Sequence, residues 1–286
     1  MVAGKLISRI KNNKFAQFLQ RVIKEFLEDN CPLLAAAISF NLLFSLFPFV
    51  IAMISLASLF IDSNVVREQI IQGVTYIFSI SSDFIANILN YVIEARGATG
   101  IISAVLLVFG GLAFFDTVRI ALNKVWKAEK PQNFFKGHLL DMVMMFGMAI
   151  LFIIASSIIV FIRLMGEFGL NLISNSPVGG LLLFHILIIL LDILLLFVVF
   201  LLLYKFIPNM KIRWKDIWLG ALIAAVFAEI VNIALTWFIT NFKPYDLVYG
   251  PLGAVIALLF WAYLISVIGL LFAKISEVRL AIKNGN

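Results

Sequence analysis

The stretch IISAVLLVFGGLAFFDTVRIALN occupies residues 101–123 and decides the class of fold. Its first fifteen residues carry no charge, and the run is long enough to cross about 30 Å of hydrocarbon as a helix. Asp116 and Arg119 then follow three residues apart in the same run. A charge at the centre of a span costs about 2.5–3.5 kcal/mol, so each of these side chains needs a partner or a wet cavity.

The composition of the whole chain agrees with this stretch. Of the 286 residues, 63% are hydrophobic and 13% are charged, whereas a soluble domain carries about 25% charged residues. So much apolar surface does not fit inside one core, which predicts a membrane protein. The single cysteine, Cys31, excludes an internal disulfide and is expected to be a small buried hydrophobe. With only two histidines, His138 and His185, we expect no metal site and no cofactor.

Six apolar runs are each long enough to span a membrane as a helix. They lie at residues 34–60, 100–122, 139–163, 181–205, 216–240 and 251–273. The predicted fold is therefore an all-α membrane protein, a six-transmembrane-helix bundle that forms a single polytopic domain over residues 1–286.

The distribution of Lys and Arg predicts the orientation of these spans. Of the 22 basic residues, 17 lie in the N-terminal segment, in the connections after the second and fourth spans, and in the tail. Four lie in the other three connections, and Arg119 lies inside a span. Cytoplasmic loops carry the excess of Lys and Arg, so both termini are predicted to be cytoplasmic. The net charge of +6 is then a topology signal, and we expect no nucleic-acid partner.

Two segments outside the spans have helical periodicity. Residues 14–27 place apolar side chains on one face and basic ones opposite, which predicts an amphipathic helix within a cytoplasmic segment 1–30. It lies either at the lipid interface or against cytoplasmic loops, and the sequence favours neither. Residues 61–99 hold two short amphipathic patterns around a break at Ser79–Asp83, which predict an outer helical hairpin.

Polar side chains recur inside the apolar runs. The predicted cavity-lining residues are Asn41, Asp116, Arg119, Asn123, His185, Asp192, Glu229 and Asn232. Two interpretations fit them. They either pair with one another to hold the bundle together, or they line a polar intramembrane cavity between the second, fourth and fifth spans. Interhelical hydrogen bonds in membranes contribute only about 0.6 kcal/mol each, which favours the cavity. Asp192 and Glu229 share one nearby base, Arg119, so one acid would be protonated, which suits proton coupling.

Three further positions bear on this interpretation. Pro48 lies in the middle of the first span and predicts a helix kink there, because proline removes a backbone donor. Gly110 and Gly111 predict a close approach of another helix. Asp141 begins the third span, where we expect water to solvate it.

Three motifs resemble a known family. AAAISFNLLFSLFPFVIA (35–52), ALNKVW (121–126) and YGPLGAVIALLFWAYLISVIGLL (249–271) are similar to signatures of the YihY/virulence factor BrkB membrane protein family, formerly labelled ribonuclease BN. The resemblance covers nearly the whole chain, and Asn123 matches the asparagine of an Ala-Leu-Asn element. The family usually ends its last span with Gly-Ala-Glu, where this chain has Phe272-Ala273-Lys274, so any role of that glutamate does not carry over.

The resemblance implies a bacterial inner-membrane protein with a part in moving envelope lipids. The first hypothesis is a transporter or flippase of a lipid or lipid-linked anion, with membrane lipids as partners. In it Arg119 meets the anionic head group, and Asp192 or Glu229 carries a proton or orients Arg119. A membrane-bound hydrolase is disfavoured because the sequence shows no catalytic residues and places His138 and His185 on opposite sides of the bilayer. A scaffold protein whose polar groups only pack is the third hypothesis. The sequence predicts no oligomeric state.

Overall fold

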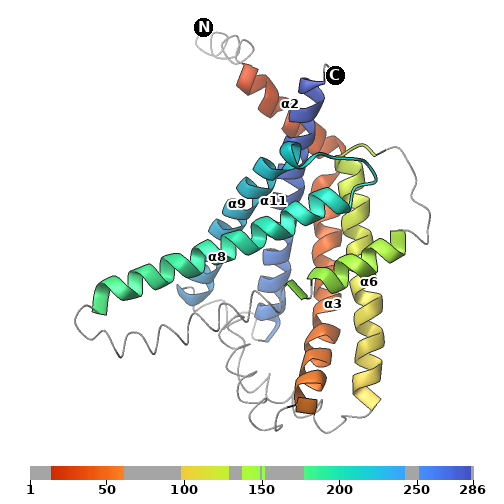
Figure 1. Cartoon of the computed structure of the whole chain (residues 1–286), viewed down its shortest axis with the longest axis vertical. Helices are drawn as coiled ribbons and strands as arrows, with labels where there is room; N and C mark the ends of the chain where they lie inside the picture. The colour runs from red at the N-terminus through yellow and green to blue at the C-terminus, as the bar shows by residue number, and fades with distance from the viewer. Residues whose placement is uncertain are drawn as a thin grey trace. The chain divides into compact units, whose positions relative to one another are not determined.

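The structure is a computed structural model that describes residues 14–60, 98–128, 137–148, 150–151, 177–241 and 251–284. Within these ranges every regular element is a helix (Figure 1). The labelled helices are α2 (Lys14–Glu28), α3 (Cys31–Phe60), α6 (Ala98–Val125), α8 (Pro177–Phe206), α9 (Trp214–Asn241) and α11 (Pro251–Lys283). A further apolar helix spans Gly137–Met148.

Helices α3, α6, α8, α9 and α11 lie over five of the six predicted runs. The third run is described only at its start, by Gly137–Met148, and the hairpin predicted over 61–99 lies almost wholly outside the described residues. The last helix continues to Lys283, beyond the predicted end of the span at residue 273. It continues because Lys274 and Val278, one turn apart, are both buried and give the extension a packed face.

Three helices are long and apolar enough to cross a membrane: Ile186–Phe206, Trp214–Phe238 and Val255–Lys283. Helix α8 shows why they need lipid. Its apolar side chains Ile186, Leu190 and Leu194 repeat every fourth residue, and all three are exposed. Such a surface is unfavourable in water and favourable in hydrocarbon. The chain is therefore a helical membrane protein, whereas the count of six spans and their orientation stay predictions.

The chain divides into two compact units. The first comprises residues 1–34, 119–229 and 267–286, and the second comprises 35–118 and 230–266. Helices α3, α6, α9 and α11 each contribute a segment to both units.

Helix α2 packs in the first unit through a narrow stripe. Val22 and Phe26, one turn apart, are buried, as the predicted apolar face requires. Leu19, Ile23 and Leu27 form a neighbouring stripe that remains exposed. The helix ends at Glu28, and in the turn after it Asn30 has a φ of 55°, the left-handed conformation that asparagine adopts readily. One apolar stripe of α2 therefore contacts protein, while the other is free to contact lipid.

The first unit also holds a close approach between α9 and α11. Gly220 lies at the start of a small-residue face of α9 that continues through the buried Ala221, Ala224 and Ala228. A Cβ atom on Gly220 would lie 3.0 Å from the carbonyl oxygen of Phe272 and would overlap the hydroxyl of Ser276. Only glycine allows α11 to pack at this distance.

The second unit joins α3 to α6. A Cβ atom on Gly110 would lie 3.1 Å from the Cα atom of Ser45, so the close helix approach predicted at this glycine is confirmed. Pro48 follows one turn later, and α3 continues through it to Phe60. The side chain of Pro48 and the predicted kink lie outside the described part of the structure.

Candidate functional site

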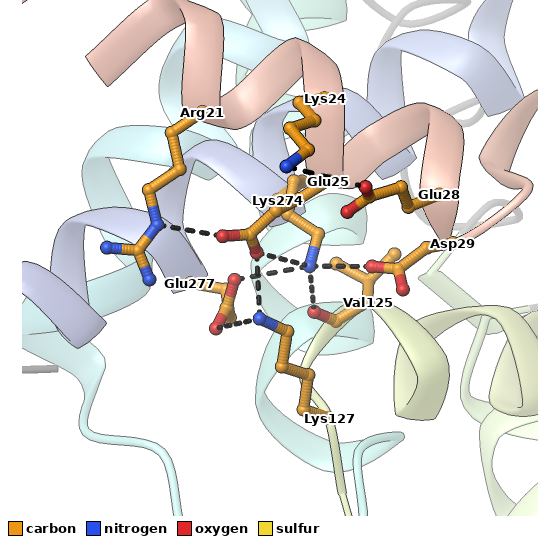
Figure 2. A network of polar contacts seen from close by, with 9 residues as sticks. All are labelled: Arg21, Lys24, Glu25, Glu28, Asp29, Val125, Lys127, Lys274 and Glu277. Carbon is orange, nitrogen blue, oxygen red and sulfur yellow. Dashed lines mark hydrogen bonds and ion pairs between the residues drawn. The ribbon is translucent and has the colours of Figure 1, made fainter. Parts of the chain in front are cut away.

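Six charged side chains meet in the first unit and form what we call the Lys274 cluster: Arg21, Glu25, Asp29, Lys127, Lys274 and Glu277 (Figure 2). They come from α2 and the turn after it, from the turn after α6, and from the end of α11. All of these segments were predicted to lie on the cytoplasmic side. The ion pairs bring these segments close together, as a common side of the membrane requires.

Lys274 is the centre of the cluster. Its side chain is 0% exposed, and its Nζ lies 2.8 Å from Asp29 Oδ2, 3.2 Å from Glu277 Oε2 and 3.6 Å from Glu25 Oε2. It also donates a hydrogen bond of 2.9 Å to the carbonyl oxygen of Val125 (Figure 2). The Lys274 ammonium thus joins α2, α6 and α11, and its charge is balanced by carboxylates rather than by water.

Within the cluster, Glu25 is the acid with the most cationic partners: Arg21, Lys127 and Lys274. Arg21 Nε lies 2.7 Å from one carboxylate oxygen, and Lys127 Nζ lies 2.8 Å from the other. The left-handed φ of 50° at Lys127 turns the chain there and brings this lysine to the cluster. Burial alone would raise the pKa of Glu25, but the hydrogen bonds from Lys127 and Arg21 outweigh it and lower the pKa from 4.5 to about 2.

We expect the stability of the protein to depend on pH through the Glu25 carboxylate. A folded pKa of about 2 against an ordinary value of 4.5 means that its contribution is complete above pH 4.5 and is lost as the pH falls toward 2. Glu25→Gln should therefore unfold at a lower temperature than the parent at pH 7. The difference should shrink below pH 4.5, as followed by circular dichroism in detergent. A difference that stays constant down to pH 2.5 would contradict this linkage.

Arg119 is held at a second place in the first unit. Its side chain is 13% exposed, and its Nε lies 3.2 Å from Asp141 Oδ1, which belongs to a side chain only 2% exposed. His138 Nδ1 lies 3.7 Å from the other oxygen of Asp141. A Cβ atom on Gly137 would fall 2.6 Å from Arg119 Nη1, so the guanidinium packs directly on the glycine that begins the helix. The expectation that water solvates Asp141 is wrong, because this packing buries it.

Other predicted residues of the first unit lie on different helices. Asn123 Oδ1 accepts a hydrogen bond of 2.7 Å from the backbone N–H of Asn209, which fixes the α8–α9 connection to the end of α6. Glu229 is buried in α9, and Asp192 is half-buried in α8; both have polar partners. His185 lies in α8, but its side chain is outside the described part of the structure.

The remaining predicted residues belong to the second unit. Asn41 Nδ2 of α3 donates a hydrogen bond of 2.6 Å to Thr117 Oγ1 of α6. Asn232 Oδ1 of α9 accepts one of 2.6 Å from the indole N–H of Trp261 in α11. Asp116 is half-buried in α6, one turn before Arg119. Each of the two asparagines therefore links a pair of helices. This is the packing role that the sequence allowed as the alternative to a polar cavity.

Three partners are not among the residues predicted from the sequence: Thr117, Trp261 and Lys274. Thr117 lies next to the predicted Asp116, and Trp261 lies within the last of the three family motifs, so a hydroxyl and an indole donor near polar positions were the available signals. Lys274 stands in the sequence only as a departure from the family motif. An uncompensated lysine at the end of an apolar run was the available signal that carboxylates from elsewhere must meet it.

Comparison with known proteins adds relatives along most of the chain. The sequence model of the family described as Virulence factor BrkB matches residues 22–283. A UPF0761 membrane protein of Actinobacillus pleuropneumoniae is 25% identical over 256 residues, 86% of this chain and 87% of the relative. Another UPF0761 membrane protein, from Aliivibrio salmonicida, is 26% identical over 275 residues, 94% of this chain and 83% of the relative. No solved structure matches the chain.

Proposed function

Since the chain belongs to the virulence factor BrkB family of membrane proteins, we propose that it moves a lipid or lipid-linked anionic substrate across the bacterial inner membrane. The resemblance of its motifs to that family is confirmed by the match over residues 22–283. The substrate class, the membrane and the cytoplasmic position of both termini are part of the proposal.

One observation carries it: an arginine and an aspartate form a buried pair on two mainly apolar helices. Replacing a buried ion pair with apolar residues of similar volume is often neutral or stabilising, so packing alone does not explain why the chain keeps Arg119 and Asp141. A guanidinium held in low dielectric is a strong site for a phosphate or carboxylate, which it binds through two parallel N–H donors.

The arrangement suggests how such a site works. Asp141 orients Arg119 and neutralises it while the site is empty of substrate. An anionic head group then competes with Asp141 for the guanidinium, and a proton taken up by the carboxylate weakens its hold. In this mechanism Asp141 has the orienting role that the sequence assigned to Asp192 or Glu229, and these two acids are left as candidates for carrying protons.

The test is reconstitution of the full chain into liposomes with fluorescent anionic and zwitterionic lipids. We expect Arg119→Gln to lower the transbilayer rate of the anionic lipid at least about tenfold, since a charge-assisted hydrogen bond is worth about 1.5–3 kcal/mol. Arg119→Lys should retain part of the rate, because it keeps the charge and loses the planar fork. Lys283→Gln, an exposed change at the end of α11, is the control.

Two results would count against the proposal. Parent protein that leaves the lipid rate at the level of empty liposomes would favour a scaffold role. A rate unchanged in both Arg119→Gln and Asp192→Asn would remove these residues from the transport path. Melting temperatures of all variants separate a lost site from a lost fold.

A further inference from the structure

A basic pocket lies at the connection between α8 and α9, within the first unit. It has a volume of about 760 Å³, and its lining contains the four bases Lys205, Lys211, Arg213 and Lys215. No acidic residue lines it among the residues that the structure describes. The adjacent Asp216 lies 3.0 Å from Arg213 and offsets the charge of this one base, so the pocket keeps a net positive charge.

One wall of the pocket is held rigidly. Lys205 Nζ donates a hydrogen bond to the carbonyl oxygen of Ile212 and lies 5.3 Å from the centre of the Trp214 ring. Phe206 meets the same ring edge-on, with centroids 6.0 Å apart. Cation–π and edge contacts of this kind fix an amphipathic wall that presents charge beside aromatic surface.

The backbone under the pocket is also anchored. Ile207 and Ile212, at the two ends of the connection, are buried, and the N–H of Asn209 between them is bound to Asn123 Oδ1. The connection is therefore preformed, so a ligand would not have to order it.

The three remaining bases are available to a ligand. Lys211, Arg213 and Lys215 are exposed, and neither Lys211 nor Lys215 has a carboxylate partner among the described residues. Arg213 has one, but 70% of its side chain remains exposed. Three cations around one cavity favour a phosphate over a single carboxylate, because a phosphate offers more acceptor oxygens and more charge.

The position of the pocket indicates that the phosphate belongs to a lipid head group. It lies between the end of the apolar helix Ile186–Phe206 and the start of Trp214–Phe238, where the chain leaves one candidate span and enters the next. The aromatic side chains Phe206, Trp214 and Trp218 are exposed there. Exposed tryptophan at the ends of apolar helices is typical of the level of lipid head groups in a membrane.

We propose that this pocket binds the phosphate-bearing head group of an anionic membrane lipid. Basic pockets between helices on the cytoplasmic side have the charge that such head groups require. The site is separate from the Arg119–Asp141 pair, and the proposal stands whether or not the protein transports lipid.

The experiment is lipid binding to the full chain in neutral detergent, where no charged bilayer surface attracts the ligand. Native mass spectrometry would count phosphatidylglycerol and phosphatidylcholine of equal chain length retained at increasing concentration. The triple variant Lys211→Gln/Arg213→Gln/Lys215→Gln should weaken phosphatidylglycerol about a hundredfold, at about a factor of five per basic residue. Phosphatidylcholine should be unaffected.

A matched triple variant controls for the loss of charge. Lys14→Gln/Arg279→Gln/Lys283→Gln removes the same three charges from exposed positions outside the pocket, and phosphatidylglycerol binding should change less than about twofold. Trp214→Ala keeps every charge and should still weaken binding about tenfold, because it removes the wall that positions Lys205.

Different results would contradict the site itself and the assignment of a lipid as its ligand. Equal loss in the two triple variants, or equal binding of both lipids by the parent, would overturn the site. Displacement of phosphatidylglycerol by millimolar inorganic phosphate or glycerol phosphate would identify a soluble anion as the ligand and overturn the lipid assignment. A melting temperature within about 2 °C of the parent confirms that the variants are folded.

Discussion

Lys274→Met is expected to be the most damaging single substitution in the described part of the chain. It keeps the volume of the side chain and removes its charge, leaving Glu25, Asp29 and Glu277 around a methyl group. Breaking a buried ion pair from one side costs about 3–5 kcal/mol, because the partner charge stays buried without its counterion. Arg21 and Lys127 still reach Glu25, and Lys127 Nζ also lies 3.9 Å from Glu277 Oε1, so the cost falls mainly on Asp29.

Cys31 gives a direct measurement. It is the only cysteine and is completely buried, so a thiol-reactive dye labels it only when the first unit opens. The temperature at which labelling begins should fall markedly in Lys274→Met.

Two companion variants make the Lys274→Met result specific. Asp29→Asn added to Lys274→Met should recover at least about 1 kcal/mol, since it neutralises the acid nearest to the lost ammonium. Lys24→Met removes the same kind of charge from a pair on the exposed face of α2 and should change stability by less than about 0.5 kcal/mol. A Lys274→Met protein as stable as Lys24→Met would show that the cluster does not hold these helices together.

Gly220→Leu is expected to have the second largest effect, for a steric reason. The first atom of any side chain at this position meets the backbone carbonyl of Phe272 and the hydroxyl of Ser276. A serine side chain rotates away easily, but a helix carbonyl moves only with its helix. Separating α9 from α11 should cost about 3 kcal/mol, the upper part of the range for overpacked cores.

Gly147 provides the matched control for Gly220. It also lies inside a helix, yet a Cβ atom there meets nothing within 4 Å. Gly147→Leu should therefore leave stability unchanged or raise it by up to about 0.8 kcal/mol through helix propensity. The pair Gly220→Ala and Gly220→Ala/Ser276→Ala tests the contact itself, and the double variant should be the more stable. Equal melting temperatures for the two leucine variants would contradict the close approach.

Periodicity along the chain predicted where the helices lie, because hydrophobic length is a local property. The same apolar runs made their polar residues easy to pick out, and in the structure Asn41, Asn123 and Asn232 each have a hydrogen-bond partner. Pairs within one turn, such as Arg21 with Glu25, are readable from their spacing of four residues.

Partners from distant segments were not predictable in the same way. Asp141 was assigned to water because it opens an apolar run, but its burial depends on Arg119 packing on Gly137, which no local spacing shows. Lys274 meets acids from the other end of the chain, and its hydrogen bond to Val125 joins residues 149 positions apart. Such contacts follow from the tertiary arrangement and not from the composition of either segment.

The Lys274 cluster also has a consequence for how the protein is made. Glu25 and Asp29 leave the ribosome long before Lys274 is synthesised. Until then Glu25 can pair with Arg21 and Lys127, but Asp29 lacks the Lys274 ammonium and α2 has no central cation to dock against. Completion of α11 is thus the event that docks α2. A translation product that stops before residue 274 would present an undocked α2 to the proteases that remove unfinished membrane proteins.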